Sequence, residues 1–137
     1  MFNDVTFIFD IDGTLCPIKQ EGGRYEDLIP YAHMIEKLRW YHSKGAKIVL
    51  FTSRNMNTYR GNLGKINIHT AKTLLAWLEK WDIPYDELLY GKPWPGKNGF
   101  YVDDRTIRPD EFLEMDLEEM DQCCKGSRKN LNDGRGI

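Results

Sequence analysis

The sequence predicts an α/β fold built on a mostly parallel, doubly wound sheet, because apolar strand-like runs alternate with helix-like segments along the chain. The clearest strand candidates are residues 5–10 (VTFIFD) and 46–52 (AKIVLFT). Continuous apolar runs of this kind are typical of strands that are buried on both faces. Between them, apolar residues recur at helical spacing over 31–43. These three segments therefore form a predicted strand–helix–strand unit.

The segments that follow repeat the alternation. Residues 69–81 are predicted to form a second helix, with leucines gathered on one face. Residues 87–90 (ELLY) and 100–102 (FYV) are predicted to be the third and fourth strands. A last helix is expected over 110–124.

Length and composition predict one domain. A chain of 137 residues can bury a substantial core but is short for two independent ones. We expect the domain to span residues 1–125 and a polar tail over 126–137 to be disordered, since the tail is rich in Gly, Asn and Arg. The three cysteines have neither the number nor the spacing of a disulfide framework or a zinc site. We therefore expect reduced thiols and a cytoplasmic protein.

Charge and hydropathy argue against two classes of partner. Nineteen Lys and Arg stand against twenty-one Asp and Glu, for a net charge of −2. This balance gives no electrostatic footprint for nucleic acid or for an anionic membrane surface. No apolar run approaches the roughly 20 residues that a membrane span needs, and a strand at 5–10 leaves no room for a signal peptide. We therefore expect a small-molecule partner, no nucleic acid and no membrane.

Residues 10–14 (DIDGT) directly follow the first predicted strand and carry the strongest functional signal. Asp10 and Asp12 are two residues apart on an extended chain, so both point to the same side. Gly13 lets the chain turn away and leaves the two acids at the strand's carboxyl end, where open α/β sheets bind ligands. Such a pair suits phosphoryl transfer, because one carboxylate can attack phosphorus while the other handles the leaving-group proton. The alternative is an ordinary Asp-rich turn.

Three further polar signals stand at predicted strand ends. Thr52 offers a hydroxyl, and the backbone N–H groups that follow it, beginning at Ser53, could hold phosphoryl oxygens. Lys92 follows the third strand and could neutralise a phosphate. Asp103 and Asp104 follow the fourth strand with carboxylate oxygens of the kind that Mg²⁺ prefers. Because converging acids repel one another, we expect a bound divalent cation.

In this order, DIDGT, the strand-ending Thr, GKP and VDD resemble the motifs of the haloacid dehalogenase superfamily of aspartate-nucleophile phosphotransferases, over residues 5–110. Residues 50–67 (LFTSRNMNTYRGNLGKIN) and 90–112 (YGKPWPGKNGFYVDDRTIRPDEF) are similar to small phosphatases of capsular polysaccharide biosynthesis. The resemblance implies a Rossmann-like core without a cap domain, since the intervals between motifs hold only a helix and a loop. It implies a Mg²⁺-dependent phosphomonoester hydrolase acting on a small metabolite, with sugar and amino-alcohol phosphates as candidates.

The resemblance also implies a role for each residue of the motifs. Asp10 would be the nucleophile that forms an aspartyl-phosphate, and Asp12 would be the general acid and then the general base. Mg²⁺ would be held by the Asp10 carboxylate, the Asp12 backbone carbonyl and Asp104, with Asp103 as a second ligand or orienting residue. The transferred phosphoryl group would be bound by Thr52, Ser53 and Lys92.

A site without a cap needs another cover, and two loops are candidates. Residues 16–29 resemble the superfamily's flap, which could open and close over the site. Residues 54–67 form an unusually long connection. They carry Arg54, Arg60 and Lys65, cations fit to hold an anionic, hydroxyl-rich substrate. A solvated polar loop is the alternative for the last two, and a homo-oligomer whose partner subunit builds the rim is a further expectation.

Other functions stay open at this point. A nucleotide phosphatase or a phosphomutase could use the same scaffold, although mutases usually need a cap to exclude water. A receiver-like signalling module also joins acids, Thr or Ser, Lys and Mg²⁺. Its phosphoacceptor follows the third strand, however, whereas the acid pair here follows the first. A phosphate-binding protein without activity is the remaining non-enzymatic alternative.

Overall fold

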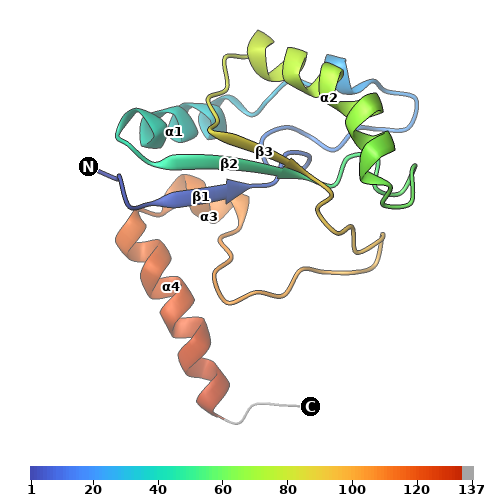
Figure 1. Ribbon diagram of the computed structural model, residues 1–137. Coiled ribbons are helices and arrows are strands. Elements are labelled where there is room, and N and C mark those ends of the chain that lie inside the picture. The colour runs from blue at the N-terminus through green and yellow to red at the C-terminus, as the bar shows by residue number, and fades with distance from the viewer. Residues whose placement is uncertain (134–137) are drawn as a thin grey trace. The chain divides into compact units, whose positions relative to one another are not determined.

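The computed structural model describes residues 1–133 and has an α/β fold (Figure 1). The chain divides into two compact units, Met1–Trp94 and a second that begins at Pro95, and each is described by itself. The boundary falls in a loop that contains prolines and glycines, as domain boundaries often do. Sequence reasoning, which predicts one domain over residues 1–125, does not anticipate it.

The first unit holds a parallel sheet of three strands in the order β1-β2-β3. The strands are β1 (Thr6–Phe9), β2 (Lys47–Thr52) and β3 (Glu87–Tyr90). The connections are helical: η1 (Tyr25–Asp27) and α1 (Ala32–Ser43) precede β2, and α2 (Leu63–Lys80) precedes β3. Both crossovers advance in the same direction, so right-handed connections place α1 and α2 on one side of the sheet, as Figure 1 shows.

These strands confirm the predicted α/β class and the parallel pairing. A doubly wound sheet also reverses its strand order at one point, which brings helices to both faces. The order β1-β2-β3 runs one way only, so no such reversal is seen within residues 1–133. No helix in this part of the chain is both long and apolar enough to cross a membrane.

The two faces of the sheet pack unequally. On the helix side, the ring of Phe7 lies 4.7 Å from that of Tyr41 in α1, and Leu50 is fully buried. On the other side, Ile8 is 66% exposed and Leu89 is 45% exposed. The run 46–52, predicted to be buried on both faces, forms the central strand, where Ile48, Val49 and Leu50 are buried. The two outer strands alternate in exposure instead.

The element positions in the first unit follow the sequence predictions closely, with one difference. The third strand spans the predicted residues, and the second strand and first helix each begin one residue later than predicted. The helix predicted over 69–81 begins earlier, at Leu63. The reason is a cap, since the side chain of Asn62 accepts a hydrogen bond from the backbone N–H of Lys65 at 3.1 Å. The loop predicted over 54–67 is correspondingly shorter.

The predicted fourth strand is wrong. Residues 100–102 form no strand, and Phe100 and Val102 are 85% and 97% exposed. An apolar run of three residues is too short to specify a strand unless a partner strand holds it in register.

The helical part of the second unit is longer and more divided than predicted. In place of one helix over 110–124 there are two, α3 (Pro109–Glu114) and α4 (Leu117–Asn130). Asp116 separates them because its side chain accepts a hydrogen bond from the Glu119 N–H at 2.8 Å and so starts a new helix. The tail predicted to be disordered from residue 126 is helical through Asn130 and then forms a 3-10 turn, η2 (Leu131–Asp133). Residues 134–137 lie outside the described residues.

We expect Leu50→Ala to lower the free energy of unfolding by about 2 to 5 kcal/mol, because Leu50 is fully buried in the central strand and its removal leaves a cavity. Leu89→Ala is the matched control, since Leu89 is half-exposed on the neighbouring strand and should cost about 1 kcal/mol or less. Urea unfolding followed by circular dichroism measures both. Equal losses would contradict the burial pattern of the sheet.

Candidate active site

The candidate site is built on a tight turn at the carboxyl end of β1. Gly13 has a φ of +88°, a conformation that residues with a side chain rarely adopt. The carbonyl of Ile11 accepts a hydrogen bond from the N–H of Leu15 at 2.8 Å, and both of these side chains are fully buried. The apolar residues therefore anchor the turn, while Asp10 and Asp12 stay partly exposed beside them.

The carboxylate of Asp10 meets the residue that follows β3. Its Oδ1 lies 3.3 Å from Nζ of Lys92, and the Thr14 hydroxyl donates a long hydrogen bond of 3.4 Å to its Oδ2. The backbone N–H of Lys92 in turn donates to the carbonyl of Thr52 at 3.1 Å, which joins the ends of β2 and β3. Three of the four motifs predicted from the sequence therefore meet at one edge of the sheet.

Burial raises the pKa of the Asp10 carboxyl above its ordinary value, because loss of water disfavours the charged form. The charge and hydrogen bond of Lys92 and the backbone N–H of Ile11 lower that pKa, while the nearby charge of Asp12 raises it further. The net direction is upward. An ionised Asp10 would therefore be stabilised by a further positive charge.

Asp12 has a different partner, the guanidinium of Arg54. Nε donates to Oδ2 at 2.8 Å and Nη2 donates to Oδ1 at 3.0 Å, so the two groups form a planar fork. The thiol of Cys16 also lies 3.6 Å from Oδ1. Burial, together with the charge of Asp12, raises the pKa of this thiol to about 12, so it remains a neutral donor. Both oxygens of Asp12 are thus held in one orientation.

Arg54, which the sequence predicts to bind substrate, lies in the frame of the site. Its side chain is only 1% exposed, and its backbone N–H donates to the hydroxyl of Thr52 at 3.0 Å. The guanidinium carbon lies 4.3 Å from the centre of the Tyr25 ring and 5.9 Å from that of Trp77. The group is enclosed by aromatic rings and by Asp12 rather than turned toward solvent.

The other two cations predicted to bind substrate form no ion pair with Asp10 or Asp12 among the described residues. Arg60 and Lys65 are exposed, and Lys65 lies in the first turn of α2 rather than in a loop. Within residues 1–133, no hydrogen bond or ion pair joins either of them to Asp10 or Asp12. Ser53, predicted to help bind phosphate, is partly exposed beside the buried Thr52.

The two acids of the fourth motif belong to the second unit. Oδ2 of Asp104 accepts a hydrogen bond from Nη1 of Arg128 at 3.1 Å, and Oδ1 of Asp103 accepts one from the N–H of Arg105 at 3.2 Å. The bonds from Arg128 and Asp103 lower the pKa of Asp104 below its usual range. The role of this pair as metal ligands stays a prediction from the sequence.

The donor chemistry of the turn suits a hard cation. Among the described residues, no three or more His, Cys, Asp or Glu side chains are grouped so that they could hold a metal ion together. The first unit nevertheless supplies two oxygen donors of the kind that Mg²⁺ prefers, the carboxylate of Asp10 and the backbone carbonyl of Asp12. The raised pKa of Asp10 means that Lys92 alone does not offset its charge, which fits an added cation.

Sequence reasoning did not identify three residues that touch these acids or Arg54. Thr14 belongs to the DIDGT motif itself, so its contact with Asp10 was within reach of a sequence argument. Cys16 and Tyr25 lie in the segment predicted to be a flap, but nothing in the pattern pairs them with Asp12 or Arg54.

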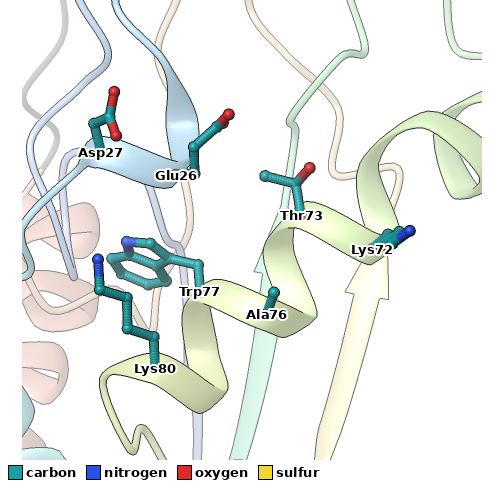
Figure 2. A pocket seen from close by; sticks show the side chains of 7 residues that line it. All are labelled: Glu26, Asp27, Lys72, Thr73, Ala76, Trp77 and Lys80. Carbon is teal, nitrogen blue, oxygen red and sulfur yellow. The ribbon is translucent and has the colours of Figure 1, made fainter.

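A cavity of about 450 Å³ lies beside the site's aromatic frame, between η1 and α2. Figure 2 shows the ring of Trp77 on the α2 side and two acids of η1 across from it. The Trp77 indole N–H donates to the carbonyl of Leu28 at 2.7 Å, which ties the residue directly after η1 to α2. The cavity is lined by Glu26, Asp27, Lys72, Thr73, Ala76, Trp77 and Lys80. This hydrogen bond and the cavity therefore lie side by side where η1 meets α2.

Comparison with known proteins places the chain in a family. No protein-family model matches it, and no curated protein matches it. A protein from Vibrio cholerae, solved by crystallography, is 49% identical with a TM-score of 0.84, over 90% of this chain and 98% of that chain. The chain belongs to the family of this Vibrio cholerae protein.

Two further solved structures are similar over part of their length. One is a chain of a Pnkp1/Rnl/Hen1 complex, 25% identical over 80% of this chain and 33% of that chain, with a TM-score of 0.44. The other is a chain of the Pnkp1/Rnl/Hen1 RNA repair complex, 23% identical over 84% of this chain and 31% of that chain, with the same TM-score of 0.44. The Vibrio cholerae relative, by contrast, shares the fold over nearly its whole length.

In this member of the family, we expect Arg54→Ala to lower the free energy of unfolding by about 3 kcal/mol, because the change removes a buried guanidinium and leaves the partly exposed Asp12 without its counter-charge. The matched control is Arg24→Ala, which removes a fully exposed ion pair with Glu26 and should leave the free energy of unfolding nearly unchanged, because water screens that pair. Urea unfolding at pH 7 measures both. Similar losses for the two variants would mean that the buried pair of Arg54 and Asp12 contributes no more to stability than an exposed ion pair.

We expect Asp10→Asn to raise the free energy of unfolding at pH 7 in metal-free buffer. The folded state raises the pKa of Asp10, so ionising it disfavours folding at every pH above the folded value. The gain should shrink as the pH falls through the folded-state pKa and vanish below about 3, where the carboxyl is protonated in both the folded and the unfolded state. Urea unfolding of both proteins across this range tests it. A gain independent of pH, or a loss at pH 7, would contradict the direction of the shift.

Proposed function

We propose that the protein is a phosphomonoester hydrolase of the haloacid dehalogenase superfamily, without a cap domain, that uses Asp10 as nucleophile and Mg²⁺ as cofactor. The observation that carries this proposal is the meeting of three motifs at one edge of the sheet. Lys92 contacts Asp10 through its ammonium at 3.3 Å and Thr52 through its backbone N–H at 3.1 Å. A nucleophilic acid, a cation and a buried hydroxyl at parallel strand ends suit the binding and transfer of a phosphoryl group.

In the first half of the proposed reaction, a carboxylate oxygen of Asp10 attacks phosphorus and the bond from phosphorus to the ester oxygen breaks. Asp12 in its protonated form gives its proton to that oxygen and becomes a carboxylate, so the product leaves as a neutral alcohol. Lys92 is placed to offset the negative charge of the phosphoryl group. The result is an aspartyl-phosphate on Asp10.

In the second half, water attacks phosphorus while Asp12 takes up a proton from that water. The bond between phosphorus and Asp10 breaks, which releases inorganic phosphate and restores the carboxylate. One residue therefore serves as acid and then as base, and both roles need it in a constant position. The fork from Arg54 supplies that position, and each carboxylate oxygen keeps a second lone pair for the reacting group.

Mg²⁺ would be held in the first unit by the carboxylate of Asp10 and the backbone carbonyl of Asp12. When bound, it would supply positive charge against the phosphoryl oxygens. Asp103 and Asp104 are proposed as further ligands on the evidence of the sequence motif alone.

We propose a small phosphorylated metabolite as substrate and the cytoplasm as the place of action. The resemblance of residues 50–67 and 90–112 to phosphatases of capsular polysaccharide biosynthesis favours a sugar or amino-alcohol phosphate. The thiols of Cys16, Cys123 and Cys124 are free, which accords with a reducing compartment. A homo-oligomer whose partner subunit contributes to the rim of the site is part of this proposal.

The proposal is tested by inorganic phosphate release from a panel of sugar phosphates, amino-alcohol phosphates and nucleotides, with Mg²⁺ and with chelator. We expect metal-dependent turnover that Asp10→Asn abolishes. Lys92→Ala should lower kcat/KM by about 100- to 1,000-fold, the usual effect of removing one group that stabilises the transition state. Lys44→Ala is the control, since this exposed lysine precedes the opposite end of β2 and should leave the rate unchanged.

Each other outcome selects a different function. Turnover that survives Asp10→Asn would discard that residue as nucleophile. A preference for nucleotides would favour a nucleotide phosphatase. A phosphoryl group that moves to another position of the substrate, with no inorganic phosphate released, would favour a phosphomutase. No turnover on any ester would favour a receiver-like or phosphate-binding protein.

A further inference from the structure

We propose that Tyr25 is a positioning residue for the general acid, and that it acts on Asp12 through Arg54. The inference rests on the proposed phosphatase function and adds a residue from the segment before α1 to its machinery. It is built on a chain of two contacts, from ring to guanidinium and from guanidinium to carboxylate.

The two contacts use different parts of the Arg54 side chain. Nε and Nη2 lie along the edge of the planar guanidinium, and this edge makes the fork with Asp12 at 2.8 and 3.0 Å. The Tyr25 ring lies 4.3 Å from the central carbon, within the range of a cation–π contact. Because the fork constrains only one edge, the orientation of the whole group depends on what holds it from other sides.

Burial makes the aromatic contact hard to replace. The Arg54 side chain is 1% exposed, so water does not surround the guanidinium. Burial is the main cause of a raised pKa at the Tyr25 hydroxyl, so the phenol is neutral and the contact is with the ring rather than with a phenolate. Trp77 is the second ring, farther away at 5.9 Å. If the Tyr25 ring is lost, the guanidinium gains room on that side.

Tyr25 is more exposed than Trp77, the other ring beside Arg54. Trp77 is buried in α2, whereas η1 contains no buried residue and borders the 450 Å³ cavity. Arg54 therefore lies between a buried ring of α2 and a partly exposed ring of η1, so the place of the Tyr25 ring bears on the orientation of the guanidinium and, through it, of Asp12.

A positioning role for Tyr25 has a kinetic signature that depends on the leaving group. Alkyl phosphates release a strongly basic alkoxide unless a proton is delivered in step with bond cleavage. An aryl ester such as p-nitrophenyl phosphate releases a weakly basic phenolate that leaves without a proton. A displaced Asp12 therefore slows hydrolysis of alkyl phosphates and leaves hydrolysis of aryl phosphates unchanged.

The test compares kcat/KM of the native protein, Tyr25→Leu and Tyr25→Phe on p-nitrophenyl phosphate and on the best alkyl phosphate of the panel. Tyr25→Leu should lose about 10- to 100-fold on the alkyl ester, a part of what a general acid contributes, and should stay within about 3-fold on the aryl ester. Tyr25→Phe keeps the ring and should behave as native on both. Tyr31→Leu, at the half-exposed tyrosine before α1, is the control and should change neither rate.

Three results would overturn the inference. Tyr25→Leu could lose the same factor on both esters, which is the mark of a merely structural role, or it could lose nothing. Tyr25→Phe could fall as far as Tyr25→Leu, which would assign the effect to the hydroxyl.

Failure of the phosphatase proposal is recognised separately, because the native protein would then turn over neither ester. The coupling is still tested in that case by a double-mutant cycle of urea unfolding with Tyr25→Leu and Asp12→Asn. Both residues contact Arg54, so we expect their effects on the unfolding midpoint to be non-additive. Additive effects would overturn the coupling whatever the reaction is.

Discussion

The buried pair between Arg54 and Asp12 is the interaction on which the candidate site depends. Asp12 stands on the turn after β1 and Arg54 follows β2, so the pair ties two strand ends together. A guanidinium this deeply buried is tolerated only when its donors and its charge are met. The fork with Asp12 satisfies the donors and the charge of Arg54, and the ring of Tyr25 adds a cation–π contact. The backbone N–H of Arg54 donates to the hydroxyl of Thr52. One side chain thereby fixes three segments around the turn of the candidate site.

The two acids of the turn have cations of different kind, and the difference matches their proposed tasks. Lys92 is a flexible point charge beside Asp10, and it can shift its attraction to an incoming phosphate. Arg54 is a rigid fork that holds Asp12 in one orientation. A nucleophile whose charge is only partly offset and an acid–base residue in a fixed position are what a two-step phosphoryl transfer requires.

The predictions that succeeded depend on long or strongly patterned segments. The second strand and the first helix lie where the sequence places them, because their apolar pattern extends over several residues. The third strand, only four residues long, is held by pairing with β2 along its whole length. The short run 100–102 failed as a strand because three residues carry too little pairing energy of their own. The early start of α2 was missed because a single cap, Asn62, moved the boundary.

The sequence by itself determined the local features of the site. Two carboxylates on one side of the chain and a turn at Gly13 follow from neighbours along the chain, whose geometry is set by backbone sterics. Only the tertiary structure decided the partner of each carboxylate. Arg54 lies 42 residues beyond Asp12, and their contact requires β1 and β2 to pair in one register and the arginine to be buried. Whether a cation meets substrate or another side chain is therefore decided by packing, which no local pattern encodes.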